Sequence, residues 1–223
     1  MDDLVRQAIR IYRRYQVEIV EALTLCPWAE RARLDARVAE RVIVGSELDV
    51  EEPLREIERL ARDPEVEIGL LIFPRLGLSR PEFERFVAGV IQKDSARREV
   101  GTTPFAMAAF HPDAEPDFGS PERLIPFLRR SPDPTIQLVR CSALDRVREG
   151  FNEGTHFMDV SMIATLELPS ENTTPLRERI ARANQRTVEQ LGVAEIERRL
   201  SAIFTDRDAT YAEWERARAL RQS

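Results

Sequence analysis

The chain has 223 residues, 43% of them hydrophobic and 32% charged, and a formal net charge of −6. This balance is typical of a folded protein with a sizeable core and excludes an intrinsically disordered chain. The acidic charge argues against a nucleic-acid-binding protein. No apolar run approaches the ~20 residues of a membrane helix, and the N-terminus lacks a signal-peptide pattern, so we expect a cytoplasmic protein with no membrane partner.

The N-terminal residues show the periodicity of an amphipathic helix. Apolar residues recur at spacings of three and four over residues 3–25, which predicts one long helix with a single apolar face. Proline disfavours helical geometry in the residue before it, so Pro27 should end this helix near Cys26. The two cysteines, Cys26 and Cys141, fit reduced thiols better than a disulfide framework.

Four strand-like segments then alternate with helix-like segments. Two capping-box patterns, Asp49 with Glu52 and Ser79 with Glu82, mark helix starts. Because strand–helix–strand crossovers join parallel strands, the order predicts an α/β domain whose helices pack on a four-stranded mixed or parallel sheet. A ferredoxin-like α+β sheet is the alternative. The strands are expected at 40–46, 66–74, 104–112 and 134–142, and the helices at 49–63, 79–93, 121–129 and 143–151.

The C-terminal third is helical apart from one ambiguous stretch. Residues 152–174 fit either a helix or an added strand. A helix then opens at Thr174-Pro175 and ends at Gly192, a residue suited to a left-handed helix terminus. Helices at 193–204 and 208–221 should follow. We therefore expect a single domain over 1–205 and a helical tail over 206–223, with the C-terminal helices as a candidate oligomer interface.

Polar and reactive residues follow each predicted strand. In α/β sheets, ligands bind beyond the carboxyl ends of the strands. The four expected strands end at Ser46, Arg75, His111 and Arg140. If the strands are all parallel, these ends share one rim, which predicts a site there.

Three residues are candidates for catalytic chemistry. His111 could serve as general acid or base because imidazole titrates near neutral pH; the structural alternative is a histidine bonded to a backbone carbonyl. Asp113 could orient that ring or simply form the turn between two prolines. Cys26 could be a nucleophile if its pKa were lowered, or a buried structural thiol.

The stretch FLRRSPDPTIQLVR at 127–140 supplies candidate substrate-binding residues. Arg129, Arg130 and Arg140 flank a turn that contains Ser131. Guanidinium groups suit the carboxylate or phosphate of a small ligand, although they equally suit internal ion pairs. His156 is a weaker candidate. With two histidines in the chain, a metal site would also need carboxylates or Cys26.

Three motifs in order resemble a bacterial family catalogued as a domain of unknown function, number fourteen-fifteen. Its members typically carry Leu-Cys-Pro-Phe-Ala, Phe-His-Pro-Asp-Tyr and Arg-Ser-Pro-Tyr-Pro before a His-Leu-Leu-Arg strand. The resemblance covers roughly residues 5–192 and implies that the candidate residues form one constellation. In this chain the motifs read LCPWAE (25–30), FHPD (110–113) and RRSPDPTIQLVR (129–140).

This chain departs from those motifs at four positions. Trp28 replaces the usual phenylalanine, and Ala114 and Asp133 stand where tyrosine is usual. Gln137 stands where a second histidine would fall. If that histidine were a base or a metal ligand, His156 would have to replace it. The resemblance implies no settled activity and names no cofactor.

The favoured hypothesis is a cytoplasmic enzyme that acts on a small anionic metabolite. His111 would be the general acid/base, oriented by Asp113, and the arginines would clamp the anion. A non-catalytic module that binds a ligand or a protein partner is the second hypothesis, and a metal-binding protein is the third. An enzyme requires a partly exposed His111 in a pocket, whereas a binding module would have the histidine packed away.

Overall fold

The computed structural model describes residues 2–26, 28–45, 49–99, 101–152 and 176–222. The prediction for 152–174 therefore falls, from residue 153 onward, outside the described residues, as does His156. The elements in chain order are α1 (Asp2–Tyr15), the π-helix η1 (Gln16–Glu21), α2 (Ala29–Leu34), β1 (Val38–Val42), α3 (Glu51–Ala61), β2 (Ile68–Ile72), α4 (Arg80–Ala96), β3 (Phe105–Phe110), α5 (Pro121–Leu128), β4 (Thr135–Arg140), α6 (Cys141–Asn152), α8 (Leu176–Leu191) and α9 (Val193–Gln222).

The four strands form one mixed sheet in the order β1-β2-β4-β3. β1 and β2 are parallel, and β4 runs antiparallel to both of its neighbours. The predicted α/β class with a four-stranded mixed sheet is confirmed. In the ferredoxin-like alternative, the second and third strands follow each other directly. Here helix α4 lies between β2 and β3, so the order of elements is not ferredoxin-like.

The reversed direction of β4 corrects the expectation of a single rim. β1, β2 and β3 point one way, so their carboxyl ends share an edge of the sheet, whereas β4 ends at the opposite edge. Arg140 therefore lies at the end of the sheet where β3 begins, paired with Phe105. His111 follows β3 at the other end. The two residues cannot act on one small ligand.

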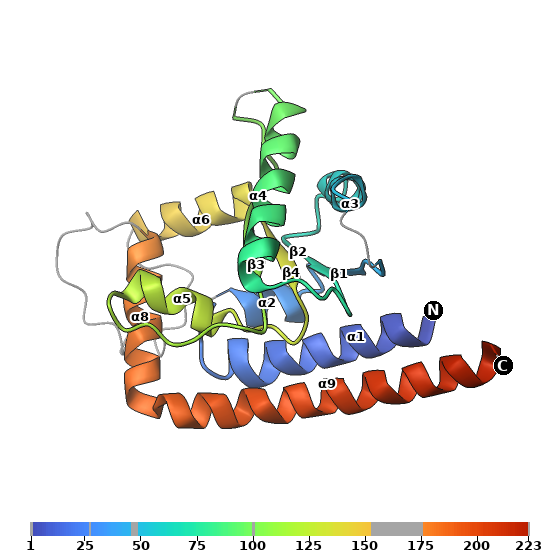
Figure 1. Cartoon of the computed structure of the whole chain (residues 1–223). Coiled ribbons are helices and arrows are strands. Elements are labelled where there is room, and N and C mark those ends of the chain that lie inside the picture. The colour runs from blue at the N-terminus through green and yellow to red at the C-terminus, as the bar shows by residue number, and fades with distance from the viewer. Residues whose placement is uncertain (1, 27, 46–48, 100, 153–175, 223) are drawn as a thin grey trace.

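Each face of the sheet is covered by its own set of helices (Figure 1). Helices α3 and α4 cover one face, and α1, α5, α8 and α9 lie on the other. Successive strand residues point to opposite faces, so Ile68, Leu70 and Ile72 enter the core under α1, while Leu71 and Phe73 enter the core under α3 and α4. The chain thus has two apolar cores separated by a single sheet.

Two helices differ from their predicted form. The N-terminal helix does not continue to residue 25, because η1 replaces its last turns and Thr24 adopts a left-handed conformation with φ 52°. At the other end, α9 is one uninterrupted helix rather than two, because no glycine or proline lies between residues 193 and 222. The predicted helix end at Gly192 is confirmed, with φ 80°. So is the capping box at the start of α4, in which Glu82 accepts a 2.8 Å bond from the Ser79 backbone. The predicted Asp49–Glu52 capping box is wrong, because Val50 is the N-cap of α3 and Asp49 accepts a bond from the Glu51 backbone.

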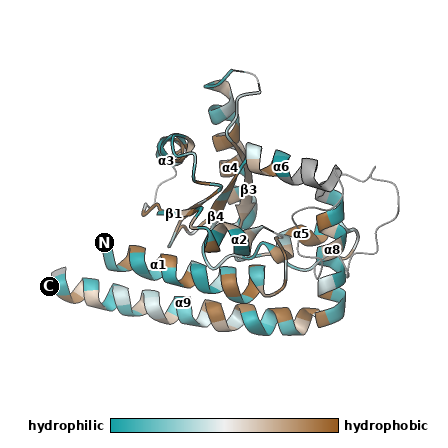
Figure 2. Cartoon of the chain, turned by 180° about the vertical axis from the view of Figure 1, so that it is seen from behind, coloured by the Kyte–Doolittle hydropathy of each residue, from teal (hydrophilic) through white to brown (hydrophobic). Residues whose placement is uncertain are grey.

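Helix α9 lies alongside α1, so the two termini are neighbours (Figures 1 and 2). Arg10 donates two hydrogen bonds to Asp206, at 2.9 and 2.8 Å, and Arg14 donates a third at 3.1 Å. These bonds lower the pKa of Asp206 to about 2. Residues 206–222, predicted as a helical tail, form the second half of α9. No helix within the described ranges is both long and apolar enough to cross a membrane.

A hydrogen bond between a buried carboxyl and a partly buried tyrosine connects the middle of α9 to the turn before β4. Tyr211 donates a 2.6 Å hydrogen bond to Asp133, whose residue is only 4% exposed. Burial raises the pKa of Asp133 to about 6, although the Tyr211 bond and the nearby Arg207 oppose this rise. A carboxyl whose folded pKa exceeds its unfolded pKa favours folding when protonated, so this contribution is complete below pH ~4 and is lost as the pH rises towards 6.

We predict that Asp133→Asn stabilises the protein at pH 8 by about 2–3 kcal/mol, because a neutral amide still accepts the Tyr211 bond without a buried charge. The gain should shrink towards zero at pH 4. Urea unfolding of both proteins across this pH range measures the difference. The exposed Asp113→Asn serves as control and should change stability little at either pH. A gain that is independent of pH would contradict the assignment.

Candidate functional site

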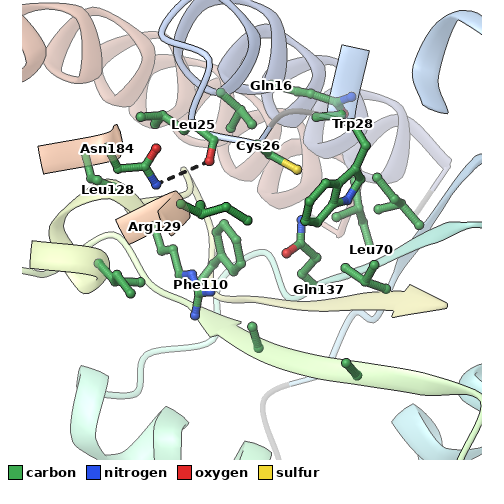
Figure 3. Close-up of a pocket in the computed structure, with 18 of the residues that line it drawn as sticks. Gln16, Leu25, Cys26, Trp28, Leu70, Phe110, Leu128, Arg129, Gln137 and Asn184 are labelled. Carbon is green, nitrogen blue, oxygen red and sulfur yellow. Dashed lines mark hydrogen bonds between the residues drawn. The ribbon is translucent and has the colours of Figure 1, made fainter. Parts of the chain in front are cut away.

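A cavity of about 490 Å³ lies between the sheet and the helices on the α1 side. This volume is in the range of small-molecule sites. Figure 3 shows the side chains that converge on it from α1, the loop before α2, the sheet, α5 and α8. Besides Tyr12 with its hydroxyl, its polar lining residues are Gln16, Cys26, Trp28, Arg129, Gln137 and Asn184.

Small side chains on β3 create the space. Strand alternation points Ala106, Ala108 and Phe110 into the cavity, while Phe105 belongs to the opposite core. On the paired strand β4, Val139 lies opposite Ala106 and Gln137 opposite Ala108. Two alanines in succession on this face leave the sheet uncovered where larger apolar side chains would fill it.

A distorted backbone segment forms the wall opposite the sheet. In η1, the Ala22 amide bonds to the Val17 carbonyl five residues earlier, at 3.1 Å. Thr24 follows with a positive φ, which is unusual for a β-branched residue. The Asn184 side chain of α8 secures this turn with a 3.3 Å bond to the Leu25 carbonyl. Strain and π-helical turns concentrate at functional sites, so this distortion marks the cavity as a candidate.

Cys26 is placed in the cavity wall by that segment, and Figure 3 shows its sulfur pointing inward. Burial raises the pKa of the Cys26 thiol to about 11, although hydrogen bonds from the backbone of Trp28 and Ala29 and the charge of Arg129 partly offset the effect. The side chain is therefore a neutral thiol at pH 7. A reactive cysteine requires a lowered pKa, which this environment does not supply.

Trp28 also lines the cavity. Its Nε1 is buried and has no hydrogen-bond partner within the described part of the chain. An unsatisfied buried donor costs about 1–3 kcal/mol. Because this nitrogen has essentially no exposed surface, it is not open to a ligand in the cavity.

Arg129 is the only charged side chain among the described residues that line the cavity. It follows the last turn of α5, and its guanidinium stacks over the Phe110 ring at 5.3 Å from the centroid. Tyr12, also in the wall, has a pKa raised well above its ordinary value by burial, so it is neutral as well. Among the described lining residues, the Arg129 side chain is therefore the one that is charged near neutral pH.

His111 lies outside the cavity lining and is 5% exposed. Its Nδ1 accepts a 3.1 Å bond from the Asp113 backbone, which leaves Nε2 as the donor to the Leu78 carbonyl at 3.0 Å. Both ring nitrogens are thus occupied by the backbone. The Asp113 side chain is 81% exposed and stands 3.9 Å from Nδ1, so its carboxylate does not orient the ring.

The remaining predicted substrate-binding residues make internal contacts. Arg130 bonds to the Pro112 carbonyl at 2.9 Å and pairs with Glu197, its guanidinium lying between the rings of Phe127 and Phe204. Ser131 is fully buried and donates to the Asp133 carbonyl.

Arg140 binds three carbonyls at the end of α3 and in the loop that follows, those of Leu60, Asp63 and Val66. Of the seven predicted site residues, the structure brings Cys26 and Arg129 together at the cavity.

The structure offers no support for the metal hypothesis within the described ranges. No group of three His, Cys, Asp or Glu side chains there is arranged to hold a metal ion. Cys26 lines the cavity, whereas His111 and Asp113 do not.

Sequence patterns missed four polar residues of the cavity. Gln137 interrupts an otherwise apolar strand, and Gln16 and Asn184 occupy the buried faces of helices. A polar residue on a predicted apolar face is the signal that could have identified these three. For the Trp28 indole nitrogen the sequence carries no comparable signal.

The fold and the cavity define a mixed-sheet α/β protein with an interior space of ligand size. Within that class, the chain belongs to the family described as "Protein of unknown function (DUF1415)", whose model matches residues 7–171. The resemblance inferred from the three motifs is thereby confirmed. No curated protein and no solved structure matches the chain. The match ends before α8, which contributes Ile180, Ala181 and Asn184 to the cavity wall.

We predict that His111→Ala lowers the free energy of unfolding by about 2–4 kcal/mol, because it leaves the Leu78 carbonyl and the Asp113 amide without partners. Urea denaturation measures this loss. Asp113→Ala, which removes an exposed side chain beside it, should change stability by less than about 0.5 kcal/mol. Equal stability of the two variants would show that the His111 hydrogen bonds are not structural.

We predict that Cys26 reacts slowly with iodoacetamide at pH 7 and about tenfold faster with each pH unit up to pH 10, because only the thiolate reacts. Mass spectrometry of a Cys141→Ser variant follows Cys26 alone, and the Cys26→Ser, Cys141→Ser double variant is the blank. A rate that levels off below pH 9 would mean that the thiol is acidic enough to be a nucleophile.

Proposed function

We propose that the protein binds a small anionic molecule in the cavity between the sheet and the α1 side, with Arg129 as the residue that pairs with the anion. The observation that carries this proposal is the position of Arg129, the one charged side chain among the described lining residues. Its guanidinium has five N–H donors, so it can bond to an anion in addition to its existing contacts. A low-dielectric wall strengthens the attraction of that charge for an anion. The cavity volume, which is in the range of small-molecule sites, supports the same conclusion.

Binding is favoured over acid–base catalysis by the predicted residues. A general base must reach the substrate with a free nitrogen or oxygen, and both nitrogens of His111 are bonded to the backbone. The Cys26 thiol is protonated at neutral pH. These features match what was expected of a ligand-binding module, with an arginine at the site and the histidine packed away.

We predict that Arg129→Gln weakens binding of small acids at least tenfold, because it removes the only positive charge in the described lining. A thermal-shift screen of acetate, benzoate, citrate and inorganic phosphate, followed by calorimetry of the best probe, measures the change.

Arg123→Gln is the matched control. Arg123 is exposed, pairs with Asp117 and lies outside the cavity lining, so its loss should leave affinity unchanged. The proposal fails if no acid in the panel binds the wild-type protein, or if Arg129→Gln binds the best probe as tightly as the wild type.

A further inference from the structure

The side chain of Gln137 is a hydrogen-bonding group of the cavity that the described protein leaves unused. Gln137 lies in the middle of β4, between Leu70 of β2 and Ala108 of β3. Figure 3 shows its amide rising from the sheet into the cavity. Among the described residues, none makes a hydrogen bond to this amide. Unlike the Trp28 indole nitrogen, its oxygen and nitrogen are not closed off from solvent.

The other two amides of the lining are held by the protein. Gln16 donates a 3.0 Å bond to the Glu21 carboxylate, and Asn184 donates a 3.3 Å bond to the Leu25 carbonyl. Each bond fixes the orientation of its amide. Gln137 differs because both its NH2 group and its carbonyl oxygen remain available to a bound molecule. A half-buried amide without a partner is unfavourable, so a ligand that bonds to it gains affinity.

The chemistry of a primary amide defines the group that it recognises best. It carries an N–H donor and a carbonyl acceptor side by side in one plane. The complementary edge has an acceptor and a donor on adjacent atoms, and glutamine pairs with the edge of adenine in this way. A lactam, with its C=O next to its N–H in a ring, has the same arrangement. Because both hydrogen bonds lie in one plane, the partner edge must be flat.

The sheet beside Gln137 leaves room for such a ring. Ala108 is its neighbour on β3, and Ala106 lies two residues away on the same side of that strand. Both side chains end at Cβ, so they form a low, flat surface. Leu70, the neighbour on β2, is larger. The room for a ring next to the amide therefore lies over β3.

From these observations we infer that Gln137 recognises a planar heterocycle with a lactam-type edge, through two parallel hydrogen bonds. The ring lies over Ala106 and Ala108 with this edge towards the amide. The Tyr12 hydroxyl, also in the lining, makes the cavity more suitable for a polar heterocycle than for a hydrocarbon. The inference rests on the proposed function in placing the ligand in the same cavity, and it requires no contact with Arg129.

Calorimetry with 2-quinolone and 1-methyl-2-quinolone tests the inference, because the methyl group removes the N–H donor and keeps the carbonyl. The wild type should bind 2-quinolone at least tenfold more tightly than the methylated probe. Gln137→Met keeps the side-chain length without the amide. This variant should bind 2-quinolone at least tenfold more weakly than the wild type, and its affinities for the two probes should agree within threefold. A tenfold preference that survives in Gln137→Met would overturn the inference, since shape alone would then reject the methyl group.

Two further variants control the measurement. Gln92→Met, on the exposed side of α4 and outside the lining, should bind both probes as the wild type does. Ala108→Leu fills the room over β3 and should weaken 2-quinolone binding at least tenfold, which also tests the location if Gln137→Met does not fold. Normal binding of 2-quinolone by Ala108→Leu would show that the ring does not lie there.

The outcomes distinguish this inference from the proposed function. If an acid binds through Arg129 but the wild type binds the two quinolones equally or not at all, the lactam class is wrong and the proposed function stands. If 2-quinolone binds as expected while no acid of the panel binds, the proposed function fails and the role of Gln137 stands.

Discussion

The antiparallel insertion of β4 between β2 and β3 is the constraint on which the rest of the structure depends. It joins the parallel β1–β2 unit to the edge strand β3 through a shared central strand. It also fixes which residues of β3 and β4 face each core. Phe105, Ile136 and Leu138 fill the core under α3 and α4. Their neighbours in sequence, Ala106, Gln137 and Val139, face the other side and leave it partly open.

Much of the fold could be predicted from local patterns. The apolar stretch around Leu70 and Leu71 indicates a buried central strand, and Gly192 indicates a helix end, because each signal depends on neighbouring residues alone. The direction and place of β4 could not be predicted this way, since spatial order depends on how distant segments pack. The π-helical turn after Tyr15 also lacks a local signal, and one of the elements packed against it, α9, comes from the far end of the chain.

The candidate site was also only partly predictable from local sequence patterns. Strand-end position identified His111 and Arg140 as candidates, but the first bonds to backbone groups on both sides of its ring and the second holds the carbonyls around the end of α3. Cys26 and Arg129 were also named from sequence, and they meet at the cavity although about a hundred residues separate them. Whether a candidate residue lines the cavity or makes internal contacts depends on its place relative to the sheet, which cannot be predicted from the residue type.

Helix α8 has a consequence for how such proteins diverge. It begins beyond the residues matched by the family model, yet its side chains complete the cavity wall and fasten the distorted turn at Leu25. The sheet floor and Arg129 lie within the matched residues, whereas this wall lies outside them. A relative that keeps the first 171 residues but carries another C-terminal segment would enclose a differently shaped space. The shape of the space would then change without any substitution in the sheet.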